Sequence, residues 1–180
     1  RIGEEADFHI ILKLLVDAGF VGFPNAGKSS LLNAMTNAKS KVAAYQFTTL
    51  EPSLGDMHGF ILADIPGLIE GASEGKGLGD KFLRHISRTK MILHCISLEN
   101  EDIKTAYKTI RKELENYSEE LAQKKEILLL TKTDLIDEKT LKTRIKEAKK
   151  LNPDVLFVSV LNDEQVKDLK DGLVKILRKL

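Results

Sequence analysis

The feature that most constrains the fold is a glycine-containing octapeptide, GFPNAGKS, at residues 22–29. It follows an apolar run at residues 14–22 and precedes a segment with helical spacing at residues 28–37, so the chain turns there from a strand into a helix. The two glycines permit a sharp turn, and the N–H groups of the loop and of the helix start then face one concave site that suits an anion. The pattern and its context predict a phosphate-binding loop.

Individual residues of this loop have distinct chemical roles in such a site. Lys28 can bridge the terminal phosphates of a nucleoside triphosphate, and the hydroxyl of Ser29 can ligate Mg²⁺. Pro24 has no N–H group, so the donors to phosphate should begin after it. The residues predicted to contact the nucleotide here are Asn25, Ala26, Gly27, Lys28, Ser29 and Ser30.

Strand-like and helix-like segments alternate along the chain, which predicts an α/β domain with a mainly parallel sheet. The expected strands lie at residues 14–22, 54–57, 60–64, 91–96, 127–130 and 155–158. The second and third are separated by a His58-Gly59 turn and should pair antiparallel. The expected helices lie at residues 28–37, 80–90, 103–121, 141–148 and 166–176. Six strands and about five helices fit a three-layer sandwich with a six-stranded sheet.

Composition narrows the class of protein further. A chain of 180 residues with 42% hydrophobic and 31% charged residues is long enough for one packed domain. Its 28 Lys and Arg residues balance 27 Asp and Glu residues, so any contact with nucleic acid must be local rather than driven by bulk charge. The single cysteine excludes an internal disulfide and fits a cytoplasmic setting, and no run of about 18 apolar residues predicts a membrane span.

A second motif, DIPG at residues 64–67, closes one of the expected strands. An aspartate at that strand end can hold the magnesium shell, and the N–H of Gly67 can reach the γ-phosphate. The next residue is Leu68, where Ras has a glutamine that orients the attacking water. Leucine forms no hydrogen bond with water, so we expect slow hydrolysis, roughly 10⁻⁴ to 10⁻² s⁻¹.

A third motif, TKTD at residues 131–134, follows a buried strand where GTPases carry N-K-x-D. Asp134 can accept two hydrogen bonds that guanine donates and adenine does not, and the stem of Lys132 can lie over the base. Thr131 replaces the usual asparagine, so we expect weaker nucleotide binding before any loss of specificity. After the last strand, a backbone N–H for guanine O6 could come from Ser159 or Val160.

Together these motifs resemble the GTPase domain of the Obg family, the ribosome-associated bacterial GTPases, over nearly all of the chain. The resemblance is carried by GFPNAGKSSLL at 22–32, FTTLEP at 47–52, LG at 54–55, DIPGLIEGA at 64–72, GKGLGD at 75–80 and FLRH at 82–85. It implies a Ras-like P-loop NTPase fold and a slow, Mg²⁺-dependent GTPase that acts as a nucleotide-dependent switch in assembly of the large ribosomal subunit. The implied partners are GTP, GDP, (p)ppGpp and the large subunit or its RNA, for a monomer with no membrane contact.

The same resemblance implies further assignments along the chain. Residues 1–12 would be the end of a linker from a missing glycine-rich N-terminal domain, and residues 13–180 the GTPase domain. Thr49 would be the switch threonine whose hydroxyl reaches Mg²⁺, with Thr48 as the alternative. The predicted catalytic residues are then Lys28, Thr49 and Gly67, and the predicted metal ligands are Ser29, Thr49 and Asp64.

Asn25 resembles the phosphate-loop asparagine that coordinates potassium in cation-activated relatives. The alternative is that Asn25 stabilises the loop through backbone hydrogen bonds. Two other functions also stay open: a nucleotide-dependent binding module with negligible turnover, favoured by Leu68, and a related ATPase, raised by Thr131 and opposed by Asp134.

The segment at residues 67–79 carries five glycines, which we expect to leave a second switch conformationally free until γ-phosphate contacts order it. Basic residues lie within and after it and are opposed only by Asp80. They either touch ribosomal RNA or form a solvated face. The basic residues are Lys76, Lys81, Arg84, Arg88 and Lys90.

Overall fold

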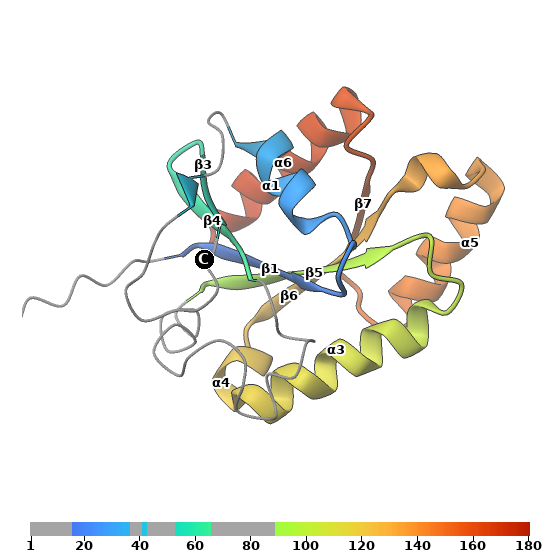
Figure 1. Ribbon diagram of the computed structural model, residues 1–180, viewed down its shortest axis with the longest axis horizontal. Helices are drawn as coiled ribbons and strands as arrows, with labels where there is room; N and C mark the ends of the chain where they lie inside the picture. Colours follow the sequence, from blue (N-terminus) through green and yellow to red (C-terminus); the bar gives the residue numbers. More distant parts are fainter. Residues whose placement is uncertain (1–15, 37–40, 43–52, 66–88) are drawn as a thin grey trace, which may run out of the picture.

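The centre of the sheet is built from strands that are buried on both faces, as the short apolar runs of the sequence predict. The computed structural model describes residues 16–36, 41–42, 53–65 and 89–180. Every residue of β1 (Ala18–Gly22) and of β5 (Met91–Ser97) is buried, and β6 (Lys125–Thr131) is buried from Ile127 onward. These three strands lie side by side in the middle of the molecule (Figure 1).

The sheet within the described ranges has seven strands, in the order β2-β3-β4-β1-β5-β6-β7. β4 (Phe60–Asp64), β1, β5, β6 and β7 (Val155–Val158) form its parallel part. β3 (Ser53–Met57) pairs antiparallel with β4 across the predicted turn, whose two residues have φ values of 54° and 86°. The mainly parallel sheet is thus confirmed, and the additional strand is the two-residue β2 (Lys41–Val42), which pairs with β3.

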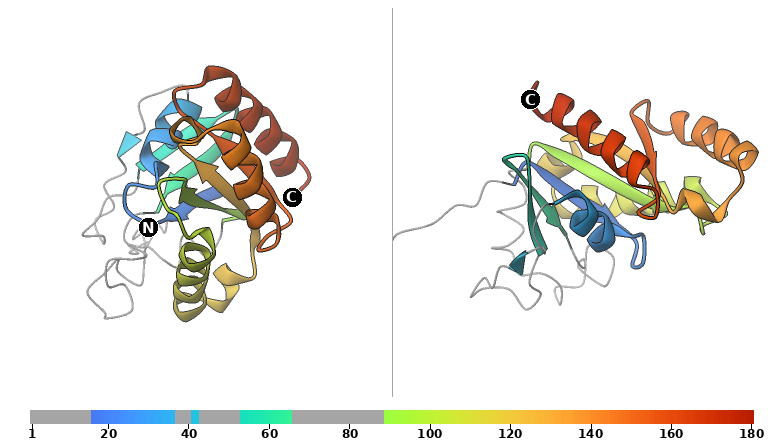
Figure 2. Two further views of the ribbon diagram at one scale, coloured as in Figure 1. Left: turned by 90° about the vertical axis from the view of Figure 1, so that its right-hand side faces the viewer. Right: turned by 90° about the horizontal axis from the view of Figure 1, so that it is seen from above.

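Helices cover both faces of the sheet, which confirms the three-layer α/β arrangement (Figure 2). On one face lie α1 (Lys28–Met35) and α6 (Asp163–Leu177). On the other face lie α3 (Ile103–Tyr117), α4 (Glu119–Ala122) and α5 (Glu138–Lys149). No helix among the described residues is long and apolar enough to cross a membrane.

Two of the predicted helices need comment. The single helix predicted at 103–121 is divided, because Ser118 is extended (φ −158°, ψ 116°) and its side chain accepts a hydrogen bond from the N–H of Leu121 at 3.2 Å. A serine hydroxyl competes with the backbone for such donors, so it favours a new helix start over a continued helix. The predicted helix at 80–90 lies, up to residue 88, outside the described residues.

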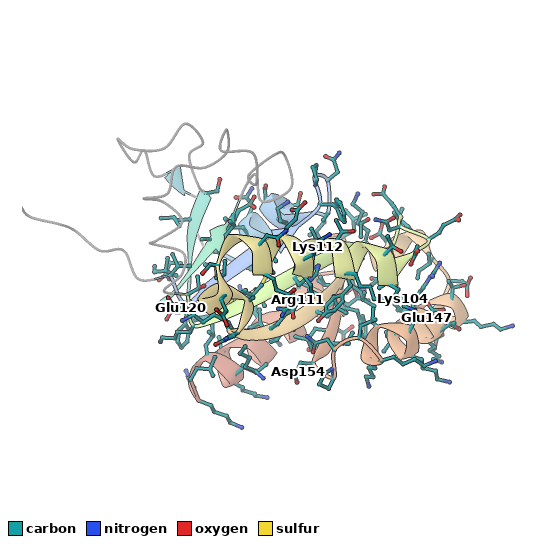
Figure 3. All side chains as sticks on the ribbon, turned by 90° about the horizontal axis from the view of Figure 1, so that it is seen from below. Lys104, Arg111, Lys112, Glu120, Glu147 and Asp154 are labelled. Atoms are coloured by element: carbon teal, nitrogen blue, oxygen red, sulfur yellow. The ribbon has the colours of Figure 1, made fainter. Side chains whose placement is uncertain are left out.

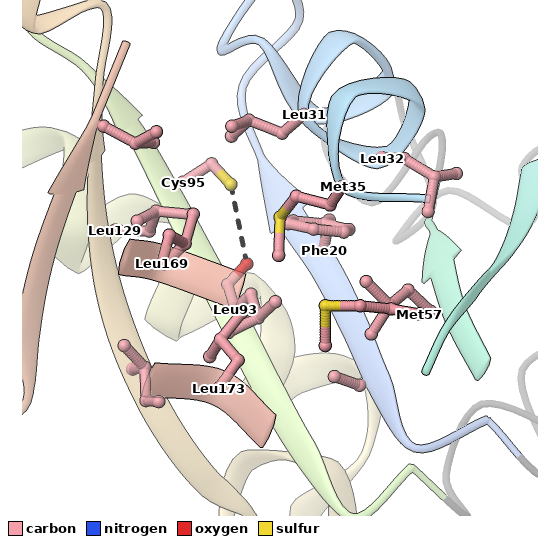
Figure 4. Packing of buried hydrophobic residues seen from close by; sticks show 14 of the residues in the cluster. Phe20, Leu31, Leu32, Met35, Met57, Leu93, Cys95, Leu129, Leu169 and Leu173 are labelled. Atoms are coloured by element: carbon pink, nitrogen blue, oxygen red, sulfur yellow. Dashed lines mark hydrogen bonds between the residues drawn. The ribbon is translucent and has the colours of Figure 1, made fainter. Parts of the chain in front are cut away.

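Figure 4 shows the core between the sheet and the α1–α6 layer, a cluster that also includes Ala26 of the phosphate loop. Leu31 and Met35 of α1 pack there in one buried cluster with Phe20 of β1 and Cys95 of β5. The thiol of Cys95 is fully buried and donates to the carbonyl oxygen of Leu93 at 3.8 Å. Burial raises the pKa of this thiol, so it stays protonated in the core.

The opposite face of the sheet contains a buried polar network beneath α3. Nδ1 of His94 lies 2.7 Å from Oε1 of Glu126, and Oε2 of Glu126 accepts from the Tyr107 hydroxyl at 3.1 Å and from Arg111 at 3.2 Å. The Tyr107 ring stacks on His94 at 5.1 Å. Burial lowers the pKa of His94, so its neutral ring donates to the Glu126 carboxylate and ties β5, β6 and α3 together. Figure 3 views this helical face, with Arg111 labelled.

Candidate nucleotide-binding site

The predicted site residues lie where the parallel strands end. β1 runs into the phosphate loop, β4 ends at Asp64, β6 ends at Thr131 and β7 is followed by Ser159. Because parallel strands end at the same edge of a sheet, the loops that follow them come together there. That edge holds a cavity of about 550 Å³, which is lined by Asn25, Gly27, Lys28, Ser29, Ser30, Glu99 and Lys132.

The phosphate loop is shaped by three residues with positive φ: Gly22 (149°), Asn25 (62°) and Gly27 (86°). A Cβ added at Gly22 would lie 2.4 Å from the backbone oxygen of Cys95, so only glycine fits between β1 and β5. The N–H of Ala26 donates to the carbonyl three residues earlier at 3.1 Å and closes the turn. The loop therefore makes the sharp turn that the octapeptide predicts.

The start of α1 carries no capping side chain. Gly27 is its N-cap residue, no side chain there accepts a hydrogen bond from the first turn, and that turn contains no acidic residue. The N–H groups of a first turn have no acceptor within the helix, and the helix dipole adds positive potential to them. This end of α1 can therefore bind an anion such as a phosphate oxygen.

Lys28 brings a cation to the same place. Its Nζ donates to the carbonyl oxygens of Gly22 and Phe23, at 3.1 Å each, so the side chain folds back over the loop. Gly22 is the last residue of β1, and Phe23 is the first residue after it. The ammonium group is thus fixed beside the N–H groups of the loop, where it can bind a phosphate oxygen.

Ser29 and Asp64 form the candidate metal site. The hydroxyl of Ser29 donates to Oδ2 of Asp64, which joins α1 to the end of β4. Asp64 is 7% exposed, and its Oδ1 has no hydrogen-bond partner among the described residues. An unpartnered buried carboxylate oxygen is costly unless a cation or a metal-bound water satisfies it. Two oxygen ligands beside a phosphate site fit Mg²⁺, which also takes ligands from water and substrate phosphates.

Thr131 joins the end of β6 to the phosphate loop. Its hydroxyl donates to the carbonyl oxygen of Ala26 at 2.8 Å, and the side chain is buried. The residue that departs from the N-K-x-D pattern therefore reaches the loop despite its short side chain. Weaker nucleotide binding because of Thr131 stays a prediction, but the contact between the two segments is present.

Lys132 and Glu99 form an ion pair in the lining of the cavity. Lys132 has a left-handed backbone (φ 58°) at the start of the short 3₁₀ turn Thr133–Leu135, and its Nζ donates to Oε2 of Glu99. The hydrogen bond from Lys132 lowers the pKa of the Glu99 carboxyl below its usual range. The ammonium of Lys132 is thus held beside Glu99.

The remaining contacts, near the predicted guanine-binding residue Asp134, connect three segments of the chain. The hydroxyl of Ser159 donates to Oδ1 of Asp134, and the N–H of Ser159 donates to Oε1 of Gln165 on α6 at 2.8 Å. The same oxygen of Gln165 accepts from the Thr133 hydroxyl at 2.9 Å. Because the Ser159 N–H is used within the protein, the N–H of Val160 becomes the better candidate donor to guanine O6.

Two of these residues, Glu99 and Gln165, were not predicted from the sequence. Gln165 stands three residues after Asn162, whose Oδ1 caps α6 by accepting from the Gln165 N–H at 3.1 Å. That spacing marks a helix start but does not reveal that the glutamine side chain turns toward the site. Glu99 follows the end of a central strand, which is a place where site residues gather, but no motif includes it.

Other predicted residues cannot be placed. Thr48, Thr49, Gly67 and Leu68 lie outside the described residues, as do the members of the basic cluster up to residue 88. Its last member, Lys90, pairs with Asp17 at 2.9 Å.

Comparisons with known proteins agree with this geometry. A family model described as 50S ribosome-binding GTPase matches residues 17–132, a range that includes the phosphate loop, Asp64 and Thr131. GTPase Obg of Porphyromonas gingivalis is 48% identical over 185 residues, which cover 98% of this chain and 47% of that protein. The chain therefore spans about half the length of the curated relatives it matches.

Solved structures of similar fold are also G domains or contain one. The G domain of the T. maritima FeoB iron transporter is 25% identical and covers 90% of this chain and 98% of its own, with a TM-score of 0.60. A GDP-bound mutant of S. thermophilus NFeoB has a TM-score of 0.62 at 19% identity, covering 86% of this chain and 59% of its own, and supports the fold alone. On the family model and the motifs that it spans, the chain belongs to the 50S ribosome-binding GTPase family, in which it is similar to GTPase Obg.

Proposed function

We propose that this chain binds GTP together with Mg²⁺ and hydrolyses it slowly to GDP and phosphate. The observation that carries the proposal is the contact between Ser29 and Asp64 beside the uncapped start of α1. It brings two oxygen ligands for a divalent cation next to the N–H groups and the lysine that suit phosphate. Membership of a GTPase family supports the same substrate.

Lys28 holds the terminal phosphates in this proposal. Loop carbonyls accept two of its hydrogen bonds, and an ammonium group has three N–H donors, so one remains for a phosphate oxygen. The N–H groups of Asn25, Gly27, Lys28, Ser29 and Ser30 are proposed as further donors, whereas the N–H of Ala26 closes the turn of the loop. Together they offset the negative charge that grows on the leaving phosphate, which is the main task of the protein in phosphoryl transfer.

Ser29 and Asp64 hold the metal in this proposal. Mg²⁺ supplies positive charge to the β- and γ-phosphate oxygens. Ser29 offers its hydroxyl oxygen, and Asp64 offers a carboxylate that is already buried beside it. Thr49, with Thr48 as the alternative, is the proposed switch ligand, and the Gly67 N–H is the proposed donor to the γ-phosphate. The assignment of the threonine rests on the resemblance to Obg, and that of Gly67 rests on the DIPG motif.

Asp134 selects guanine in this proposal. Its Oδ1 already accepts from Ser159, and a carboxylate has further lone pairs for the two N–H donors of guanine. Adenine lacks this pair of donors, so Asp134 argues for GTP over ATP. The N–H of Val160 is the proposed donor to guanine O6, and the stem of Lys132 is proposed to cover the base.

Affinity measurements test the substrate. GDP, GTP, ADP and ATP are titrated with Mg²⁺ into the protein and into its Asp134→Ala variant, with Asp168→Ala on α6 as a matched exposed carboxylate. We expect a strong preference for guanine that Asp134→Ala abolishes and Asp168→Ala leaves intact. Equal or tighter binding of ATP by the unaltered protein would favour the related ATPase instead.

Turnover separates the GTPase from a binding module. Leu68 cannot orient water, so we expect roughly 10⁻⁴ to 10⁻² s⁻¹ for the chain alone. Release of phosphate no faster than in protein-free buffer, with GTP bound, would favour the binding module with negligible turnover.

We further propose that K⁺ assists turnover through Asn25. Its side chain is exposed and lines the cavity, which supports an oxygen ligand that a cation in the cavity can reach. A monovalent cation there would offset charge in the transition state. Phosphate release is measured in KCl and in NaCl, with Asn25→Ala as the variant. Equal rates in both salts would leave Asn25 as a loop residue.

The cellular role is proposed from the relatives. The family description names binding to the 50S ribosome, and the similarity to GTPase Obg supports a nucleotide-dependent switch in assembly of the large subunit. In that role the protein would be a cytoplasmic monomer that also responds to (p)ppGpp. Cosedimentation with 50S particles tests this: we expect more bound protein with a non-hydrolysable GTP analogue than with GDP. Equal binding in both states would contradict a switch.

A further inference from the structure

Glu99 lines the nucleotide cavity without belonging to any predicted motif. It lies two residues beyond β5, and the cavity that it lines also contains Asn25 and Lys28 of the phosphate loop. Its carboxylate accepts a hydrogen bond from Lys132. An acidic side chain beside a site for a polyanion repels that ligand. A function of Glu99 that favours nucleotide binding would offset this repulsion.

The carboxylate of Glu99 is fixed by its own strand end. The hydroxyl of Ser97 donates to Oε2 of Glu99 at 3.1 Å, and the N–H of Glu99 donates back to that hydroxyl at 3.2 Å. Ser97 is the last residue of β5 and is 9% exposed. Glu99 is therefore held in place independently of Lys132, as an anchor rather than as a mobile partner.

The Lys132 side chain, in contrast to Glu99, is intrinsically flexible. Its backbone is fixed by the left-handed turn before the 3₁₀ segment, but a lysine side chain has four rotatable bonds and loses much conformational freedom when it is ordered. In this structure the Lys132 ammonium is bound to Glu99, and its side chain is 29% exposed. The Lys132 side chain is thereby held at both ends, by its backbone turn and by Glu99.

We propose that Glu99 is a positioning residue for nucleotide binding, which holds the Lys132 side chain in the lining of the cavity before the nucleotide arrives. This inference rests on the proposed function, in which the Lys132 stem covers the base. The ordering of the lysine is then completed in the free protein and no longer opposes binding. The pair is partly exposed, so the expected gain is modest, roughly a threefold to tenfold lower Kd for guanine nucleotides.

A double-mutant cycle tests the coupling. Kd values for GMP, GDP and GTP are measured by calorimetry for the unaltered protein, Glu99→Ala, Lys132→Ala and the double variant. We expect Glu99→Ala to raise Kd by roughly threefold to tenfold, by the same factor for all three nucleotides. In the Lys132→Ala background, Glu99→Ala should have no further effect, because the side chain that it positions is gone.

Two more variants sharpen the outcome. Glu99→Gln keeps an oxygen acceptor for Lys132 and should bind with an intermediate Kd. Glu120→Ala breaks the Lys124–Glu120 ion pair (3.1 Å) of similar exposure on α4, where Glu120 is labelled in Figure 3, and should leave Kd unchanged. Since Glu99 is exposed, all variants should unfold at the same temperature as the unaltered protein.

Each result that would contradict the positioning role can be distinguished from the others. If Glu99→Ala lowers Kd, and more so for GTP than for GMP, the carboxylate acts by repelling phosphates and the positioning role is wrong. An equal loss with and without Lys132 would also overturn it. Failure of the unaltered protein to bind guanine nucleotides would overturn the proposed function itself, whereas silent Glu99 variants of a nucleotide-binding protein overturn only this inference.

Discussion

The two halves of the candidate site are constructed differently. The phosphate half is one continuous segment, in which backbone N–H groups, positive φ angles and a helix end provide the binding features. The base half is assembled from the ends of β5, β6 and β7 and the start of α6, and side chains hold these segments together. The comparison teaches that loss of one residue should abolish binding by the phosphate half but only weaken binding by the base half.

Removing the lysine of the phosphate half should have the largest effect. Charge-assisted hydrogen bonds contribute about 1.5–3 kcal/mol each, so Lys28→Ala is expected to weaken GTP binding by about a hundredfold. Binding of GTP is measured by calorimetry in the presence of Mg²⁺. Lys146→Ala, on the exposed face of α5, is the matched control and should bind normally. A loss of less than about fivefold would mean that the N–H groups of the loop bind phosphate without the lysine.

Distorting the backbone of the same half should cost stability. A Cβ at Gly22 would lie 2.4 Å from the oxygen of Cys95, which belongs to the backbone of β5 and cannot rotate away. Gly22→Ala is therefore expected to lower the free energy of unfolding by about 1–3 kcal/mol, measured by urea denaturation.

A second glycine provides the control for this experiment. Gly172 lies within α6, and a Cβ added there would contact nothing within 4 Å. Gly172→Ala should raise the free energy of unfolding by about 0.5–1 kcal/mol, because alanine favours the helix. A stable Gly22→Ala protein with normal GTP binding would show that the start of the loop tolerates a shift of β1.

The same contrast explains which parts could be predicted from the sequence. The phosphate loop and the antiparallel hairpin depend on neighbouring residues, and the mainly parallel sheet follows from the alternation of strand-like and helix-like segments, so motif and periodicity were sufficient. Glu99 and Gln165 act on segments far away in the chain, and nothing in their local sequence marks that contact. The single helix predicted at 103–121 was wrong for a related reason. The apolar spacing continues past Ser118, but the hydroxyl of this residue caps a new helix and ends the first one.

Loosening the base half should have an intermediate effect. In Gln165→Ala, the N–H of Ser159 and the hydroxyl of Thr133 both lose their acceptor, so the two loops lose their link through α6 and keep the hydrogen bond from Ser159 to Asp134. We expect roughly tenfold weaker binding of GDP, because two hydrogen bonds of about 1 kcal/mol are partly replaced by water. Calorimetric titration with GDP provides the measurement.

Two glutamine variants serve as controls for this loosening. Gln165→Glu keeps the acceptor oxygen and should retain most of the affinity. Gln123→Ala removes an exposed glutamine at the end of α4 and should change nothing. Equal affinities for Gln165→Ala and the unaltered protein would mean that Asp134 and Ser159 hold the base loops without help from α6.

The smallest effect is expected where the two halves meet. Thr131 contacts the phosphate loop through one neutral hydrogen bond of 2.8 Å to Ala26. Thr131→Val keeps the shape and removes the donor, so we expect about a threefold weaker affinity for GDP, whereas Thr131→Ser should bind normally. Thr131→Asn restores the common motif. Tighter binding by Thr131→Asn would show that threonine weakens the link between the halves, and unchanged binding would show that its hydroxyl already makes the full connection.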